Sequence, residues 1–133
     1  PSWIGLGNIW ITKIELMQHN TDIEINKLFN DAYENKIEIF DGWYSRLIAE
    51  ILMNTNGKDQ PKAEDWIQKA IEFDDKRGLK WQLAMDHVVY SDLFIKNSDS
   101  VKAKKNLTKA IEIFRECGAD GWIEKYEKKL AVM

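Results

Sequence analysis

Apolar residues follow three- and four-residue steps in three separate segments of the chain, with polar residues between the apolar positions. The stripes consist of Ile25, Phe29, Ala32 and Ile37, then Ala63, Ile67, Ala70 and Ile71, then Ala103, Leu107, Ala110, Ile111 and Phe114. An α-helix returns its side chains to one face with this period, so each segment is predicted to be an amphipathic helix. We expect these to be the second helices of three helical hairpins.

The first helices of the hairpins are predicted over residues 3–19, 43–54 and 80–96, and a last helix over residues 120–131. Glycines supply the predicted stops, because glycine readily takes the left-handed conformation at a helix C-terminus; they are Gly42, Gly78 and Gly118. Predicted starts are a capping box at Thr21 and Glu24, a first turn with Pro61, and cap candidates at residues 98–100. The last helix has an apolar side and a charged side, the latter formed by Glu124, Lys125, Glu127, Lys128 and Lys129. It is therefore predicted to cap the domain.

The last two hairpins repeat each other at an offset of 40 residues. The sequence Lys-Ala-Ile-Glu occurs at 69–72 and at 109–112, and a glycine follows at the same distance in Gly78 and Gly118. A tryptophan recurs near the turn of each unit, as Trp43, Trp81 and Trp122. Since such large rings bury much apolar area, we predict that they fill the seams between hairpins.

These residues resemble the tetratricopeptide repeat (TPR). Its pattern is matched by Leu6-Gly7, Tyr90-Ser91, Phe94, Ala103, Leu107 and Ala110. The resemblance implies an all-α fold, a right-handed superhelix of about three antiparallel helical hairpins plus a C-terminal capping helix. The hairpins would cover residues 2–41, 42–78 and 79–118 within one domain, 1–133. The units are 38 to 41 residues long instead of 34, and the closing proline of the family is missing.

The stretch from Trp81 to Leu130 is similar to the C-terminal repeats of large bacterial signalling proteins, which combine a nucleotide cyclase or kinase domain with a nucleotide-binding switch domain. The resemblance implies a regulatory tail cut from a longer protein, with any catalysis outside this chain.

Charge and composition narrow the range of partners. The net charge of −3 removes the broad positive field on which sequence-independent nucleic-acid binding depends, so no nucleic acid is expected. No apolar run is long enough to cross a membrane, and the single cysteine, Cys117, favours a cytoplasmic protein without disulfides.

Few residues suggest chemistry, and we expect no catalytic, cofactor-binding or metal site. Gly5-Leu6-Gly7 lacks the third glycine of a dinucleotide loop, and Asn56-Gly57-Lys58 is predicted to be a turn. Asp74 and Asp75 are expected to cap a helix or to be solvated. His87 is predicted to pack between hairpins. The lysines of the third stripe helix read first as a solvated face and second as a phosphate-binding one; they are Lys102, Lys104, Lys105 and Lys109.

The function predicted from this sequence is a protein–protein interaction module, whose first helices line a concave groove for a peptide or protein domain. By the usual geometry of the family, the groove-facing residues are Asn8, Thr12, Arg46, Glu50, Met85, Asp92 and Lys96. The alternative is a structural or self-associating segment without a separate ligand. In that case Trp3 and Trp10 would form a homodimer contact at the N-terminal end.

Overall fold

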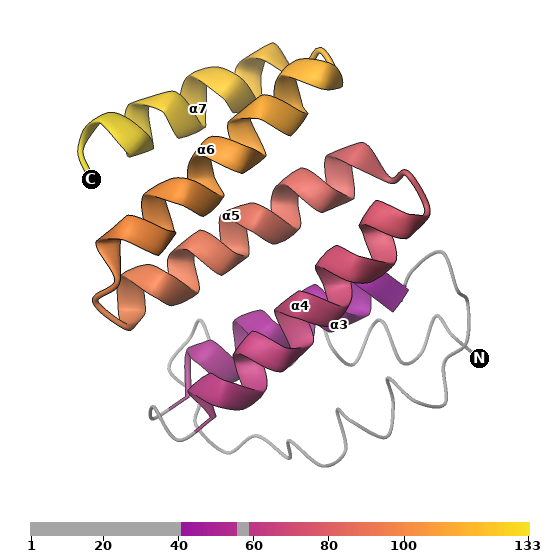
Figure 1. The fold of residues 1–133 in the computed structure, drawn as a ribbon, viewed down its shortest axis with the longest axis vertical. Helices are drawn as coiled ribbons and strands as arrows, with labels where there is room; N and C mark the ends of the chain where they lie inside the picture. The colour runs from indigo at the N-terminus through magenta and orange to yellow at the C-terminus, as the bar shows by residue number, and fades with distance from the viewer. Residues whose placement is uncertain (1–40, 56–58) are drawn as a thin grey trace. The chain divides into compact units, whose positions relative to one another are not determined.

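The computed structural model describes residues 41–55 and 59–133, and every regular element in these residues is an α-helix (Figure 1). The helices are α3 (Asp41–Met53), α4 (Gln60–Lys76), α5 (Lys80–Lys96), α6 (Ser100–Glu116) and α7 (Asp120–Ala131). The described residues contain no strand, which confirms the all-α prediction for this part of the chain. None of these helices is both long and apolar enough to cross a membrane.

The chain forms two compact units, Pro1–Ala70 and Ile71–Met133, whose boundary lies inside α4. In the first unit, α3 is buried on nearly all sides, because ten of its thirteen residues are shielded from solvent. The amide of Gln60 at the start of α4 donates a hydrogen bond of 2.9 Å to the carbonyl of Met53 at the end of α3. The prediction that Gly42 ends a helix is wrong, because this glycine lies in the first turn of α3, directly after Asp41.

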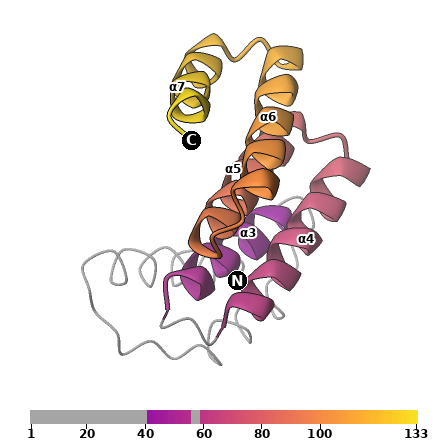
Figure 2. The same ribbon diagram turned by 60° about the vertical axis from the view of Figure 1, so that its left-hand side comes forward.

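In the second unit, α5 and α6 form an antiparallel hairpin of two 17-residue helices, and α7 packs against α6 (Figure 2). Lys80 at the start of α5 forms an ion pair of 3.0 Å with Glu116 at the end of α6, as antiparallel neighbours require. Small residues allow the two helices to approach closely: Ala84, Ser91, Ala103 and Ala110 all have no exposed surface. Ser91, which matches the repeat pattern in the sequence, is thus one of the small residues of this crossing.

Three helices end in the same way. After α4, α5 and α6, one residue takes a positive φ: Gly78 (67°), Ser98 (60°) and Gly118 (67°). In each case the following residue donates its N–H to a carbonyl five positions back, and the positive-φ residue donates to a carbonyl three positions back. This is the Schellman motif, which satisfies carbonyls that the helix leaves open. Gly78 and Gly118 are therefore confirmed as stops.

The N-terminal cap of α6 comes from Asp99, whose side chain accepts a hydrogen bond from the backbone N–H of Lys102. An aspartate here satisfies one of the free N–H groups and complements the positive end of the helix dipole. The cap lies within the predicted range of residues 98–100, but Ser98 in that range belongs to the end of α5.

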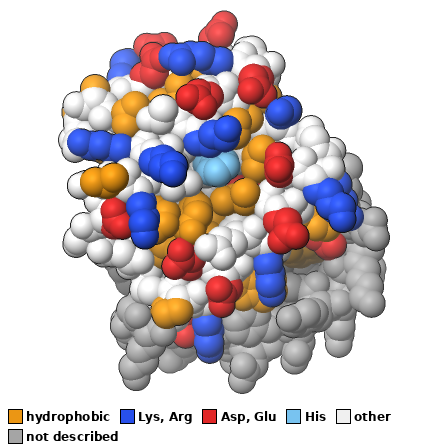
Figure 3. Space-filling model, viewed as in Figure 1, with side chains coloured by type: hydrophobic (Ala, Val, Ile, Leu, Met, Phe, Trp, Pro, Cys, Tyr) orange, Lys and Arg blue, Asp and Glu red, His pale blue; other side chains and the backbone are white. Residues whose placement is uncertain are grey.

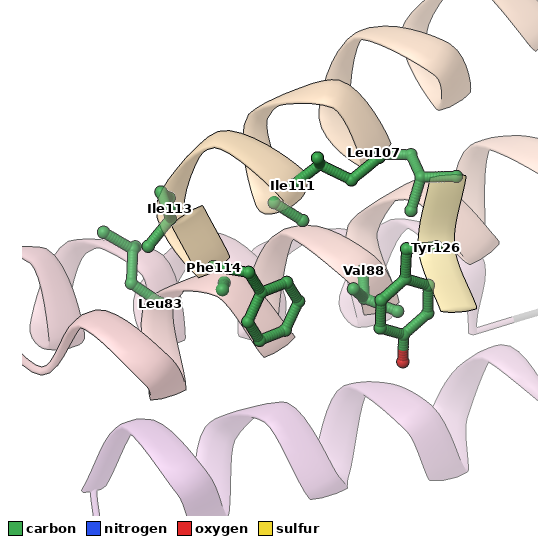
Figure 4. Packing of buried hydrophobic residues seen from close by; sticks show 9 residues of the cluster. Leu83, Val88, Leu107, Ile111, Ile113, Phe114 and Tyr126 are labelled. Carbon is green, nitrogen blue, oxygen red and sulfur yellow. The ribbon is translucent and has the colours of Figure 1, made fainter. Parts of the chain in front are cut away.

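The core of the second unit is formed by side chains from α5, α6 and α7 (Figure 4). Phe114 of α6 is fully buried, and its ring stacks with Tyr126 and Trp122 of α7 at centroid distances of 5.7 and 6.1 Å. Leu107 and Ala110, which the repeat pattern singled out, have no exposed surface. The stripe Ala63, Ile67 and Ala70 of α4 is equally buried. Burial of these positions confirms the apolar stripes predicted for α4 and α6.

Candidate binding surface along α5 and α7

A surface with binding potential lies along α5 and α7, the two helices that flank α6. Each carries one stripe of side chains at helical spacing: Trp81, Met85, Val88, Asp92 and Lys96 on α5, and Trp122, Tyr126, Lys129 and Met133 at the end of the chain. Val88 and Tyr126 are buried and form the floor of these stripes. Both helices lie close against α6, but they meet each other through long side chains. We call these two stripes the α5–α7 face.

Two contacts connect the stripes, one near each end. Trp81 and Trp122 meet edge to face near the start of the two helices, with ring centroids 5.9 Å apart. Asp92 and Lys129 form an ion pair of 2.5 Å further along. Trp81 and Trp122 lie in the first turns of their helices, whereas Asp92 and Lys129 lie in later turns. The two helices α5 and α7 therefore run in the same direction, as Figure 1 also shows.

The aromatic end of this face is only partly covered. Trp81 remains 39% exposed, although its edge-to-face contact with Trp122 has a geometry that aromatic pairs favour. The ammonium of Lys125 lies 5.1 Å from the Trp122 ring and 5.4 Å from the Tyr126 ring, within the range of cation–π attraction. Trp81 and Trp122 contact each other between α5 and α7, but Trp81 does not fill a seam as predicted, because it stays exposed.

The charged end of the face depends on Lys129, which is predicted from the sequence to lie on the solvent side of the last helix. The structure corrects this, because Lys129 reaches across to α5 and bonds Asp92. Both side chains keep about a third of their surface exposed, at 36% and 32%. Ion pairs at this exposure contribute only about 0–1 kcal/mol to stability, since water competes with both partners. A ligand can therefore displace this pair at small cost.

The predicted groove residues have different environments. Asn8 and Thr12 lie outside the described residues. Arg46 is only 5% exposed, and Glu50 is half-buried on the same helix, α3. The structure brings Met85, Asp92 and Lys96 together on the α5–α7 face, where Met85 packs against the core and Lys96 is exposed. That any of the seven contacts a partner stays a prediction.

The opposite side of α5 packs on α6 through His87. Its Nδ1 lies 3.0 Å from Oδ1 of Asn106, whose amide nitrogen donates to the carbonyl of Lys102. The second bond fixes the amide, so Nδ1 of His87 carries the proton and donates it to Asn106. Burial lowers the pKa of His87 below its usual value, the bond to Asn106 opposes this, and the charge of Lys109 lowers it further. His87 thus packs inside a hairpin, not between hairpins as predicted.

Two aspartates are buried in a way that the sequence did not indicate. Asp74 at the end of α4 and Asp86 in α5 have no exposed surface, whereas Asp75 is exposed. The solvated alternative predicted for Asp74 is therefore wrong. Asp74 follows Ala63, Ile67 and Ala70 at helical spacing, so its position on the buried stripe is visible in the sequence. The charge of Asp74 nevertheless predicts an exposed side chain, because carboxylates are mostly exposed in proteins.

The described residues contain no group of three or more metal-ligating side chains. Cys117 is exposed at the end of α6. The tripeptide Gly5-Leu6-Gly7 and the turn 56–58 lie outside the described residues.

Comparisons with protein-family models, with curated proteins and with solved structures give no match.

Proposed function

We propose that this chain is a protein–protein interaction module that holds a peptide or a segment of another protein on the α5–α7 face. The observation that carries the proposal is the way α5 and α7 are joined. They flank α6 and meet through exposed or half-buried side chains, Trp81 with Trp122 and Asp92 with Lys129. A surface of this kind offers side chains to a ligand without opening the core.

The composition of the face supports the same function. Tryptophan and methionine are enriched at protein interfaces because they supply large apolar contacts and adapt to the partner's shape. Trp81 and Met85 provide such contacts on α5, and Asp92 and Lys96 follow as charged positions. The ligand that fits this order is an extended or helical segment with apolar residues at one end and charged residues at the other.

The repeat pattern suggests a wider scheme for this face. We propose a TPR-like right-handed stack of hairpins, in which α5 and α7 are first helices and line the concave side. We further propose that the chain is the cytoplasmic regulatory part of a bacterial signalling protein such as a nucleotide cyclase, with catalysis outside this chain. The support for the last step is the resemblance of residues 81–130 to the repeats of those proteins.

A charge swap tests the proposed face. The variant Asp92→Lys/Lys129→Asp keeps the ion pair but reverses its direction, so stability should change by no more than about 0.5 kcal/mol. Peptides selected from a random library on the wild-type protein should bind this variant at least about tenfold more weakly, because the charge pattern that they read is inverted. Fluorescence anisotropy of labelled peptides measures both affinities.

The matched control is Glu124→Lys/Lys128→Glu, which reverses an ion pair of 3.1 Å between two strongly exposed side chains of α7. This control should bind the selected peptides with unchanged affinity. Equal binding by all three proteins would refute the assignment of the face. If no peptide is selected and light scattering shows a mass that rises with concentration, the chain is instead a self-associating structural segment.

A further inference from the structure

A second surface lies on α6, away from the α5–α7 face. The exposed side chains of its first three turns include four lysines, and no acidic side chain occurs on α6 before Glu112. Lys102, Lys105 and Lys109 recur at helical spacing and we call them the α6 basic face, while Lys104 lies on an adjacent side of the helix. In Figure 3, lysine or arginine side chains border the pale-blue histidine, His87, above and to its left, and hydrophobic side chains border its other sides.

Most of this positive charge is uncompensated. Lys102 is paired with Asp99 at 3.6 Å and lies 5.4 Å from the Phe94 ring. Within the part of the chain that the structure describes, Lys104, Lys105 and Lys109 form no hydrogen bond or ion pair. In contrast, Lys80, Lys128 and Lys129 each have a carboxylate partner. The three free ammonium groups are therefore available to a ligand.

The position of these lysines opposes the stability of the helix. Lys102 lies in the first turn of α6, where the helix dipole disfavours positive charge, although its ion pair with Asp99 offsets this. Lys105 and Lys109 are also four residues apart, a spacing at which like charges repel. An exposed helix that places two like charges one turn apart without a compensating contact is a candidate for selection on function.

From this charge pattern we infer that the α6 basic face docks a short acidic segment of a protein partner, with Lys105 and Lys109 as its main contacts. A long polyanion fits less well. Since the four lysines contribute +4 to a net charge of −3, the remainder of the chain carries −7 and repels an anion that extends beyond α6. A short acidic segment remains over the lysines, whose field reaches about 10 Å at 0.1 M salt.

The test uses a hexaglutamate peptide and the full chain. The variant Lys105→Gln/Lys109→Gln should bind hexaglutamate at least about tenfold more weakly than wild type at low salt. It should unfold at the same or a higher temperature, because the substitutions remove repulsion. The control Lys62→Gln/Lys76→Gln removes two exposed lysines of α4 and the same charge, and it should keep the wild-type affinity.

A second readout locates the peptide. The Cε1 proton of His87 should shift on titration with hexaglutamate, since this ring is bonded to Asn106 beside Lys102 and Lys109. The inference fails if wild type does not bind hexaglutamate, or if the α4 control weakens binding as much as the α6 variant. It also fails if oligothymidine or phosphatidylserine vesicles bind more tightly than the peptide at equal salt. The swap Asp92→Lys/Lys129→Asp should leave hexaglutamate binding unchanged, so this surface is tested independently of the α5–α7 face.

Discussion

The hydroxyl of Ser91 on α5 donates a hydrogen bond of 2.8 Å to the backbone carbonyl of Ala103 on α6, and both residues are fully buried. The contact joins the two helices where small side chains bring them together. A serine satisfies two requirements here, because it is small enough for the close approach and its hydroxyl has a partner. A larger side chain would not fit this close approach.

Substitutions at Ser91 should separate these two requirements. Ser91→Ala removes only the hydrogen bond and should lower the free energy of unfolding by about 0.5–1.5 kcal/mol. Ser91→Leu inserts extra volume into a packed crossing and should cost more, about 1–3 kcal/mol or greater. Urea unfolding followed by circular dichroism measures both. If Ser91→Leu proved no worse than Ser91→Ala, the two helices would not be closely packed at this point.

Ser98 has a φ of 60° in a position where Gly78 and Gly118 have 67°. A side chain in the left-handed region costs about 1–2 kcal/mol, so Ser98→Gly should stabilise the protein by about 0.5–1 kcal/mol. The reverse change, Gly118→Ala, should destabilise it by a similar amount, although an added Cβ meets nothing within 4 Å. Thermal unfolding of the two variants should therefore shift in opposite directions. A shift in the same direction would show that backbone conformation does not dominate at these turns.

Stability should depend on pH through His87. Its pKa is lowered in the folded state, so the unfolded chain binds a proton more readily. The contribution of His87 to the free energy of unfolding is thus complete above its pKa in the unfolded chain, about 6.5, and is lost as the pH falls below that value. The free energy of unfolding of wild type minus that of His87→Gln should decrease between about pH 7.5 and pH 5. A difference independent of pH would contradict this prediction.

Phe114 holds α7 against the hairpin through its stacked contacts with Trp122 and Tyr126. Phe114→Ala should lower the free energy of unfolding by about 3–5 kcal/mol, because it removes a fully buried ring and leaves a cavity. Hydrogen exchange should also become faster in α7 than in α5, which keeps its contacts with α6. Val101→Ala, at a site 76% exposed on α6, is the control and should leave both measurements unchanged. Uniform exchange in all three helices would show that α7 does not depend on this ring.

The helices were predictable from sequence because their signals are local. Residues 80–96 and 120–131 were predicted as helices with the bounds that the structure gives to α5 and α7. Glycine at a helix end and apolar spacing identify such segments without tertiary information. The prediction that Gly42 ends a helix failed because a glycine can also lie in the first turn of a helix, as Gly121 does in α7.

The contacts between helices are harder to predict from the sequence than the helices themselves. The pairing of Asp92 with Lys129 joins residues 37 positions apart, and no periodicity links them. Long side chains such as Lys129 can reach over a helix surface, so a position on the polar side does not fix where the charge lies. The burial of Asp74 and Asp86 also depends on packing between elements, which single-helix patterns do not describe.

The equal lengths of α5 and α6, 17 residues each, restrict how this protein can change over evolution. One residue inserted in the middle of α6 would rotate everything after it by about 100°, carrying Phe114 away from Trp122. Point replacements on the outer surface avoid this penalty, but insertions and deletions inside a helix do not. Growth or shortening of such a protein is therefore expected to proceed by whole helical pairs, with the short turns as the sites where sequence is gained or lost.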